Sequence, residues 1–200
     1  MLILSLNIFL VAKWNPVMVV RIKQRITFFL FLLLASAGVT RVHAQATDPE
    51  TRLAEMGITL AEPAAPTANF VLAVQTGNLI FLSGHGPMQE NGEYMSGKVG
   101  EELDLTQAAA AARLTGISLL TSLKAQIGSL NRVKRIVKVL GMVNAVPDFT
   151  QHPQVMNGFS DFMVEVFGEK GKHARSAVGM GSLPFNIPVE IEMIVELHGE

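Results

Sequence analysis

The sequence of 200 residues contains no cysteine. This absence excludes a disulfide framework, a thiol nucleophile and a thiolate metal site. The five histidines show no spacing typical of metal ligands, and no G-x-S-x-G motif marks a serine hydrolase. We therefore expect neither a metal ion nor a cofactor.

Acidic residues are missing from the first 44 positions, whereas five of the 16 basic residues lie there. The remaining chain has 11 basic and 17 acidic residues, which give it a net charge of −6. Binding nucleic acid through its phosphates requires a basic surface, so this charge argues against a nucleic-acid partner. A small acidic or neutral ligand is easier to accommodate.

The N-terminal 44 residues have the composition of an export signal. A basic segment begins at Met18, an apolar run covers residues 26–39, and small residues lead to Ala44. This order predicts a signal peptide at residues 1–44, cleaved after Ala44, and a periplasmic or secreted protein. The alternative is a membrane anchor, although the run is shorter than the roughly 20 apolar residues that usually span a membrane. Met18 is a second candidate for the start codon.

Residues 45–200 are sufficient for one domain with its own core. Residues 45–69 predict a short helix at 51–56 and an extended lead-in that contains two prolines. The domain itself is predicted at 70–200.

Patterns of apolar residues predict seven main elements in this domain. In chain order they are the two strands of a β-hairpin, a helix, a strand, a helix and two strands, at 70–74, 79–83, 104–127, 133–143, 153–167, 174–180 and 189–197. A polar loop is predicted at 84–100. The order ββαβαββ predicts an α+β fold in which two helices cover one face of a mixed sheet.

Arg175 starts a predicted strand among small residues, in the segment His173-Ala174-Arg175-Ser176-Ala177. The space around its guanidinium suits it to bind a carboxylate through two parallel hydrogen bonds. A surface ion pair is the commoner role of such an arginine.

Glu190, Glu192 and Glu196 alternate with apolar residues in the last predicted strand. The alternation places the three carboxylates on one face of the strand. This face is either simply solvated, or one glutamate orients a water molecule or takes a proton beside a substrate.

The segment Ser83-Gly84-His85-Gly86-Pro87 ends the second predicted strand. Its two glycines allow the backbone to approach a ligand closely and to present N–H groups. For His85 we favour a structural or solvent-facing role.

These motifs occur together with Asn69-Phe70-Val71, Leu183-Pro184 and Val189-Glu190-Ile191-Glu192. In this order and spacing they closely resemble the RidA (YjgF) family across almost all of residues 70–197. The residues before Phe70 resemble the branch of the family that has a longer N-terminus.

The resemblance implies a chorismate-mutase-like fold that forms a homotrimer of the barrel type, with three clefts at the subunit interfaces. It implies hydrolysis of reactive enamines and imines, derived from amino acids, to 2-oxo acids and ammonia. Arg175 matches the arginine that binds the substrate carboxylate, and Glu190 matches the glutamate that places the attacking water. The remaining positions implied to contact substrate are Phe70, Ser83, Gly84, Asn157 and Ala177.

Two positions depart from the deaminase pattern, since Phe70 stands in place of a tyrosine and Ala177 in place of a cysteine. We therefore keep three hypotheses. The first is an exported enamine/imine deaminase. The second is a homotrimer that binds small carboxylates or protects proteins without catalysis. The third and weakest is an endoribonuclease, which the negative charge disfavours.

Overall fold

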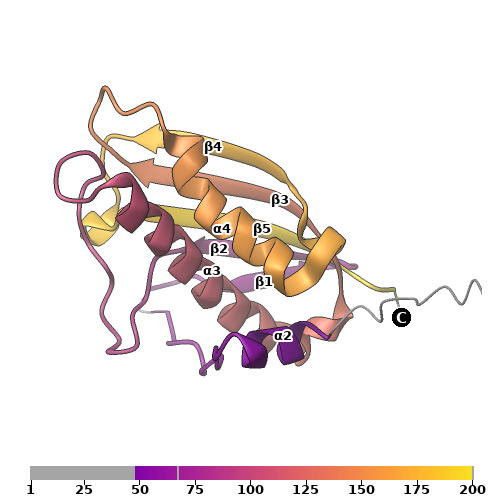
Figure 1. Cartoon of the computed structure of the whole chain (residues 1–200). Helices are drawn as coiled ribbons and strands as arrows, with labels where there is room; N and C mark the ends of the chain where they lie inside the picture. Colours follow the sequence, from indigo (N-terminus) through magenta and orange to yellow (C-terminus); the bar gives the residue numbers. More distant parts are fainter. Residues whose placement is uncertain (1–47, 67, 200) are drawn as a thin grey trace, which may run out of the picture. The chain divides into compact units, whose positions relative to one another are not determined.

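The structure, a computed structural model, describes residues 48–66 and 68–199. The predicted signal peptide, its cleavage point and the candidate start at Met18 lie outside the described residues. The main elements of the described part are α2 (Pro49–Glu55), β1 (Ala73–Thr76), β2 (Leu79–His85), α3 (Leu105–Ile127), β3 (Val133–Asn144), α4 (His152–Phe167), β4 (Ala174–Met180) and β5 (Val189–Leu197), which Figure 1 labels. Short 3-10 turns adjoin them, among them Gly168–Gly171 before β4.

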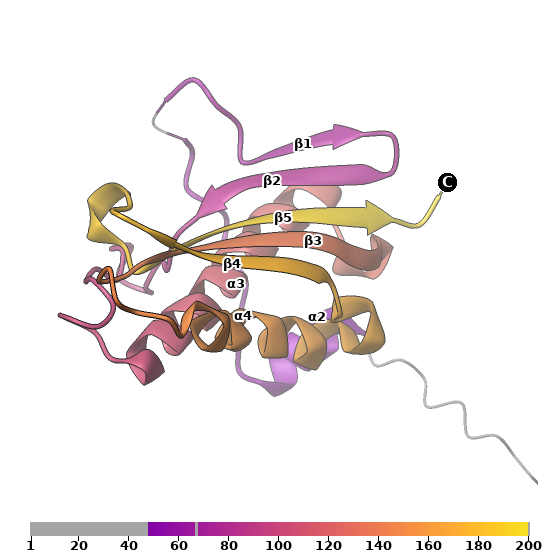
Figure 2. The same cartoon turned by 90° about the horizontal axis from the view of Figure 1, so that it is seen from above.

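The strands form one mixed sheet in the order β1-β2-β5-β3-β4. β3 and β4 are parallel, and the other neighbouring pairs are antiparallel. Helices α2, α3 and α4 lie on the same side of this sheet (Figure 2). This arrangement confirms the predicted α+β fold with two long helices on one face of a mixed sheet.

The long helix α3 covers the predicted range apart from Asp104, which caps the helix instead of beginning it. The Asp104 side chain accepts a hydrogen bond from the Gln107 backbone N–H, and the Gln107 side chain accepts one from the Asp104 N–H. This reciprocal pair satisfies two donors that would otherwise lack partners at the helix start. Gly128 ends the helix with φ of 80°, a conformation that glycine adopts without steric cost.

The prediction for the first strand was wrong, because β1 begins at Ala73 rather than at Phe70. Thr76 pairs with Leu79, so the tight turn between them sets the register of the hairpin. The Phe70 N–H donates instead to Ala68 O at 2.8 Å, so it makes no ladder hydrogen bond to β2. The apolar character of residues 70–72 therefore does not mark a strand.

The second strand continues through Gly84 to His85, two residues beyond its predicted end. Leu82 pairs with Met193 and His85 with Ile191, so three residue steps on β2 match two on β5. This irregularity is a β-bulge, which places an extra residue opposite β5 and bends the strand. Gly84 thus lies within the sheet and not in the loop predicted for it.

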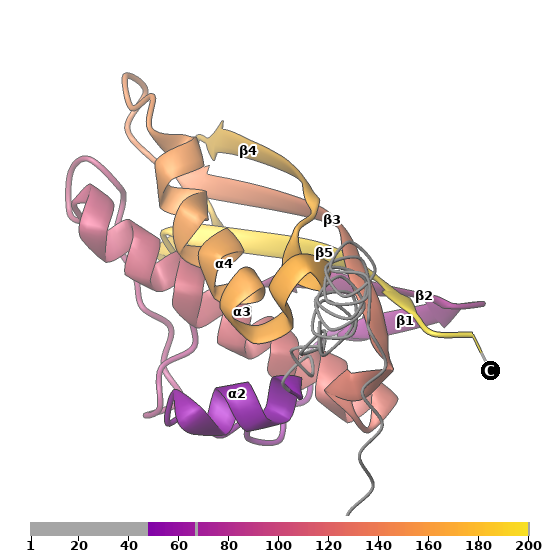
Figure 3. The same ribbon diagram turned by 45° about the vertical axis from the view of Figure 1, so that its right-hand side comes forward.

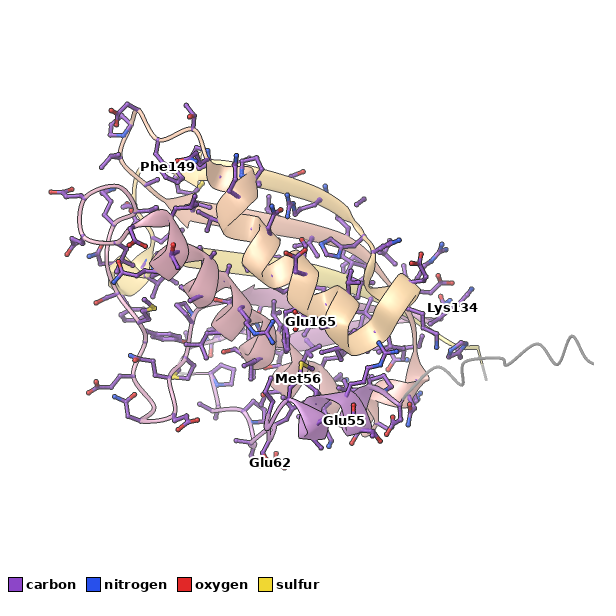
Figure 4. The ribbon with its side chains drawn as sticks, viewed as in Figure 1. Glu55, Met56, Glu62, Lys134, Phe149 and Glu165 are labelled. Carbon is purple, nitrogen blue, oxygen red and sulfur yellow. The ribbon has the colours of Figure 1, made fainter. Side chains whose placement is uncertain are left out.

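The short helix α2 packs against the two long helices and is held there by hydrogen bonds and an ion pair. Leu53 lies in the core, and Glu50 accepts hydrogen bonds from Lys124 Nζ at 2.7 Å and from Leu130 N at 3.1 Å. After α2, Arg113 of α3 contacts both Glu165 Oε2 at 2.7 Å and the Met56 sulfur at 3.7 Å. Figure 3 shows α2 beside these helices, and Figure 4 labels Met56 and Glu165, the two partners of Arg113.

The helices α3 and α4 approach each other closely at Gly158. A Cβ atom at this position would collide with the backbone carbonyl of Ala109 in α3. The close contact sets where α4 lies along α3, and α4 in turn covers β3 and β4.

No helix within residues 48–66 and 68–199 has both the length and the apolar character needed to cross a membrane.

The opposite face of the sheet carries exposed apolar side chains. Val74 is 53% exposed and Phe81 is 40% exposed, and the register places both in one row with Ile194. A second row joins Glu190, Met142 and Val178. Side chains of paired residues lie on the same face, so these two rows form the surface that we call the open face.

Candidate functional site

Arg175 lies on β4, the edge strand next to β3. It is paired with Val139, which is buried beneath the helices, so its side chain points to the helix side of the sheet. There Nη1 donates to Asn157 Oδ1 at 3.1 Å and to Ser160 Oγ at 2.9 Å. Nη2 donates to the carbonyl of Pro153 at 3.2 Å. Helix α4 therefore holds one side of the guanidinium.

These contacts use three of the five N–H groups of the guanidinium. Among the described residues, no acceptor is bonded to Nε–H or to the second Nη2–H of Arg175. Nε and Nη2 lie side by side, and two such donors match the two oxygens of a carboxylate. The surface ion pair considered for this arginine is absent among the described residues.

Asn157 and Ala177 lie with Arg175. Asn157 Oδ1 accepts from the guanidinium, and Ala177 follows Arg175 by two residues, so its side chain faces the same side of β4. Ala177 pairs with Gly141 and is partly buried against the core. We call Arg175, Asn157 and Ala177 the arginine half-site.

Glu190 lies on β5 and is paired with Met142, on the open face. A Cβ atom at position 84 would collide with its carboxylate, so Glu190 lies directly over the Cα of Gly84. Burial raises the pKa of Glu190, and the nearby charge of Glu192 raises it further. Both effects disfavour the charged form, which makes this carboxyl a better proton acceptor at neutral pH than an ordinary one.

Ser83 and Gly84 accompany Glu190 on the same part of the sheet. Ser83 sits in the bulge, where its N–H donates to Leu72 O at 3.0 Å and its hydroxyl donates to the same oxygen at 3.3 Å. Phe70 lies two residues before Leu72 and is 51% exposed. We call Ser83, Gly84 and Glu190 the glutamate half-site, with Phe70 at its margin.

The three glutamates of β5 differ in their environments. Glu196 accepts hydrogen bonds from Lys134 Nζ at 2.8 Å and from Arg135 Nε at 2.7 Å, which together lower its pKa. Glu192 is exposed. Of the three, Glu190 is therefore the one placed to act on a water molecule, because its carboxylate is half-buried and its pKa is raised.

His85 has a structural role. Its Nδ1 lies 2.7 Å from the carbonyl of Ser83, and its Nε2 lies 2.7 Å from Ser122 Oγ in α3. The ring is buried between β2 and α3, and this burial lowers its pKa. His85 therefore joins the bulged strand to the long helix and does not face a ligand.

In the structure, the predicted site residues form two separate groups. The arginine half-site lies on the helix side of the sheet and the glutamate half-site on the open face. A single chain therefore does not direct Arg175 and Glu190 to one ligand.

Sequence analysis did not assign a role to Ser160 and His173, the two residues beside Arg175. Ser160 accepts from Nη1, and its hydroxyl oxygen lies 3.1 Å from His173 Nε2. The spacing could have indicated them, since Ser160 follows Asn157 by three positions on one helix face and His173 precedes Arg175 by two.

Within residues 48–66 and 68–199, no group of three or more His, Cys, Asp or Glu side chains is arranged to hold a metal ion. The half-sites offer a guanidinium, a carboxylate with raised pKa, and the Gly84 backbone. This set suits a small carboxylate ligand and a water molecule.

Comparison with known proteins agrees with this architecture. The family model described as "YjgF/chorismate_mutase-like, putative endoribonuclease" matches residues 50–197. The chain therefore belongs to the YjgF/chorismate-mutase-like family, as its motifs predict.

Several relatives are similar over most of their length. Protein TCP17 of Trypanosoma cruzi is 42% identical over 147 residues, which are 73% of this chain and 92% of the relative. The crystal structure of Atu1372 from Agrobacterium tumefaciens is 41% identical with a TM-score of 0.70, and covers 76% of this chain and 96% of its own. A structure from Shewanella oneidensis MR-1, described as a "putative endoribonuclease", is 30% identical with a TM-score of 0.72, over 76% and 100% of the two chains.

Proposed function

We propose that this protein hydrolyses reactive 2-imino acids, and the enamines that give rise to them, to 2-oxo acids and ammonia. The main support for this proposal is the arrangement of the arginine half-site. Helix α4 binds one side of the Arg175 guanidinium, while Nε–H and one Nη2–H have no acceptor among the described residues. A carboxylate of a small substrate would receive both hydrogen bonds.

The remaining steps use the glutamate half-site. An enamine first takes a proton from solvent at carbon and becomes the iminium ion, which a 2-imino acid reaches by protonation at nitrogen. Water then adds to the iminium carbon while the Glu190 carboxylate accepts a proton from it, which gives a carbinolamine. Glu190 returns this proton to the carbinolamine nitrogen, ammonia leaves, and loss of the hydroxyl proton to solvent gives the 2-oxo acid. The raised pKa of Glu190 supports this role, because it moves the pKa of the base toward the working pH.

We propose that a homotrimer assembles the complete site, with Arg175 from one chain and Glu190 from its neighbour. The separation of the half-sites on opposite faces of the sheet supports this assembly. The exposed apolar row of Val74 and Phe81 on the open face supports it further, because burying such a surface stabilises association. A cyclic trimer would repeat one such contact three times.

The test is ammonia release from freshly generated 2-aminoacrylate by residues 45–200, together with calorimetric binding of pyruvate. Arg175→Ala should weaken pyruvate binding by about 100-fold, since two charge-assisted hydrogen bonds of about 1.5 kcal/mol each are lost. Lys170→Ala, which removes a positive charge from an exposed turn, should bind as the wild type does. Wild type that releases no ammonia above background would refute the deaminase.

The second candidate is a carboxylate-binding or protein-protecting trimer without catalysis. Phe70 favours it, because the phenyl ring lacks the hydroxyl that a tyrosine would bring to the margin of the glutamate half-site. Ala177 favours neither candidate if this position acts through its backbone, because alanine and cysteine have the same backbone groups. Pyruvate binding that depends on Arg175, with no ammonia released from any imine tested, would favour this candidate.

The endoribonuclease activity that the family description mentions is a weaker candidate for this chain. Residues 45–200 carry a net charge of −6, and neither half-site combines basic residues with aromatic ones. Failure to bind RNA at low salt, where such binding is strongest, would remove it.

For localisation, we propose export with cleavage after Ala44, supported by the order of charge, apolar run and small residues in the sequence. N-terminal sequencing of the protein from a periplasmic fraction should begin at Gln45. An uncleaved protein in the membrane fraction would favour the anchor instead.

A further inference from the structure

His173 lies just before β4 and makes two contacts through its ring. Nδ1 is 2.7 Å from the carbonyl oxygen of Gly171, and Nε2 is 3.1 Å from Ser160 Oγ. The ring also packs edge-on against Phe159, with ring centres 5.8 Å apart. The imidazole is therefore fixed between α4 and the turn that precedes β4.

The chemistry of these groups sets the direction of each hydrogen bond. A carbonyl oxygen can only accept, so Nδ1 must carry the proton and donate to Gly171. In the neutral ring Nε2 is then an acceptor, and the Ser160 hydroxyl donates to it. Once its proton faces His173, the Ser160 oxygen presents its lone pairs to Arg175 Nη1, which donates to it at 2.9 Å.

We propose that His173 and Ser160 are positioning residues that orient the Arg175 guanidinium for carboxylate binding, and that they do so only while His173 is neutral. This inference rests on the proposed function and adds to it a pH dependence of the arginine half-site. Fixing Nη1 on Ser160 sets the direction of Nε–H and the second Nη2–H. Neither His173 nor Ser160 needs to touch the substrate.

Protonation of His173 would break the arrangement. Nε2 would become a donor facing Ser160, whose oxygen would then receive two donors while its own proton lost its acceptor. Burial, and then the charge of Arg175, lower the pKa of His173, so the ring is neutral at neutral pH. The other charged groups close in sequence to Ser160 and His173 are Asp161, exposed on α4, Lys170 on the turn, and Glu169, which pairs with Lys172 at 2.8 Å.

Pyruvate binding to the trimer, measured by calorimetry at several pH values, tests the consequence for the ligand. Ser160→Ala should weaken binding about tenfold at neutral pH, because one charge-assisted hydrogen bond to Arg175 is lost. His173→Gln keeps an acceptor for Ser160 without titrating, so it should bind as wild type does at neutral pH. Wild type should lose affinity as pH falls through the His173 pKa, and His173→Gln should not. His198→Gln, at an exposed position, is the matched control.

A second measurement needs no ligand. In ¹⁵N NMR spectra, His173 should be the Nδ1–H tautomer, and the Arg175 side-chain signals should shift with the same midpoint as His173. In Ser160→Ala this shared midpoint should disappear. Arg175 signals that ignore His173 titration, or affinity for pyruvate that rises as His173 is protonated, would overturn the inference. If wild type neither binds pyruvate nor releases ammonia, the proposed function fails, and the NMR result still decides whether His173 and Ser160 orient Arg175.

Discussion

Arg175 and Glu190 lie on opposite faces of the same sheet, on β4 and β5, with β3 between them. Each has the environment that its proposed role requires, since Arg175 has two donors without acceptors among the described residues and Glu190 has a raised pKa. The proposed site therefore requires a contact between chains as well as both residues.

This relationship predicts complementation between two inactive variants. Arg175→Ala and Glu190→Gln should each lose activity as pure proteins. Trimers assembled from an equal mixture should recover about one quarter of wild-type activity, because random pairing joins an intact arginine to an intact glutamate at about one interface in four. Ammonia release from refolded or co-expressed mixtures measures this recovered activity. A mixture as inactive as its components would contradict a site shared between chains.

Glu190→Gln should increase stability while it abolishes catalysis. Because burial raises the pKa of Glu190 in the folded protein, the folded state binds more protons than the unfolded one between the ordinary value of 4.5 and the raised value. The free energy of unfolding of the wild type therefore falls as pH rises through this window, and stays reduced above it. Urea unfolding should show the variant to be more stable than wild type at neutral pH and equal to it below pH 4.5.

Gly84→Ala should damage the glutamate half-site without removing any polar group. The added methyl would collide with the Glu190 carboxylate and force it to move. We expect kcat to fall at least about tenfold, since a displacement of about 1 Å costs this much or more in catalysis. Arg175-dependent binding of pyruvate should change less. Gly181→Ala, where a methyl meets nothing within 4 Å, is the matched control and should leave both quantities unchanged.

His85 should make the fold less stable at mildly acidic pH. Burial lowers its pKa in the folded state below the ordinary value of 6.5, so in the window below 6.5 the unfolded state binds the extra proton. Stability is then fully present above 6.5 and decreases as pH falls through that window. His85→Gln should show a smaller loss between pH 7 and pH 5 in urea unfolding than wild type does. An equal loss of stability in the variant and in wild type would mean that other groups, such as His173, cause the pH dependence.

Much of the fold follows from local patterns. The ends of α3 lie within one residue of the prediction, because Asp104 and Gly128 cap this helix and capping chemistry acts within a few residues. The last two strands have the predicted bounds, since their alternation is clear. The start of β1 was mispredicted because the turn after Thr76, and not the apolar residues near Phe70, sets the pairing.

The candidate site could be predicted as a set of residues but not as an arrangement. The alternation around Glu190 indicates its face, whereas Arg175 has small neighbours on both sides that give no such signal. Which side of the sheet Arg175 faces depends on its register with Val139, a contact between segments far apart in sequence. The bulge that brings Gly84 beneath Glu190 depends on the same kind of long-range pairing.

The close contact of Gly158 with Ala109 sets the position of α4, and three of its groups hold the Arg175 guanidinium. The geometry of the arginine half-site therefore derives from the spacing of two helix backbones. Transplanting the arginine, asparagine and serine onto another helix-covered sheet would copy the side chains alone. Such a graft would bind a carboxylate only if its scaffold also allowed two helices to come this near.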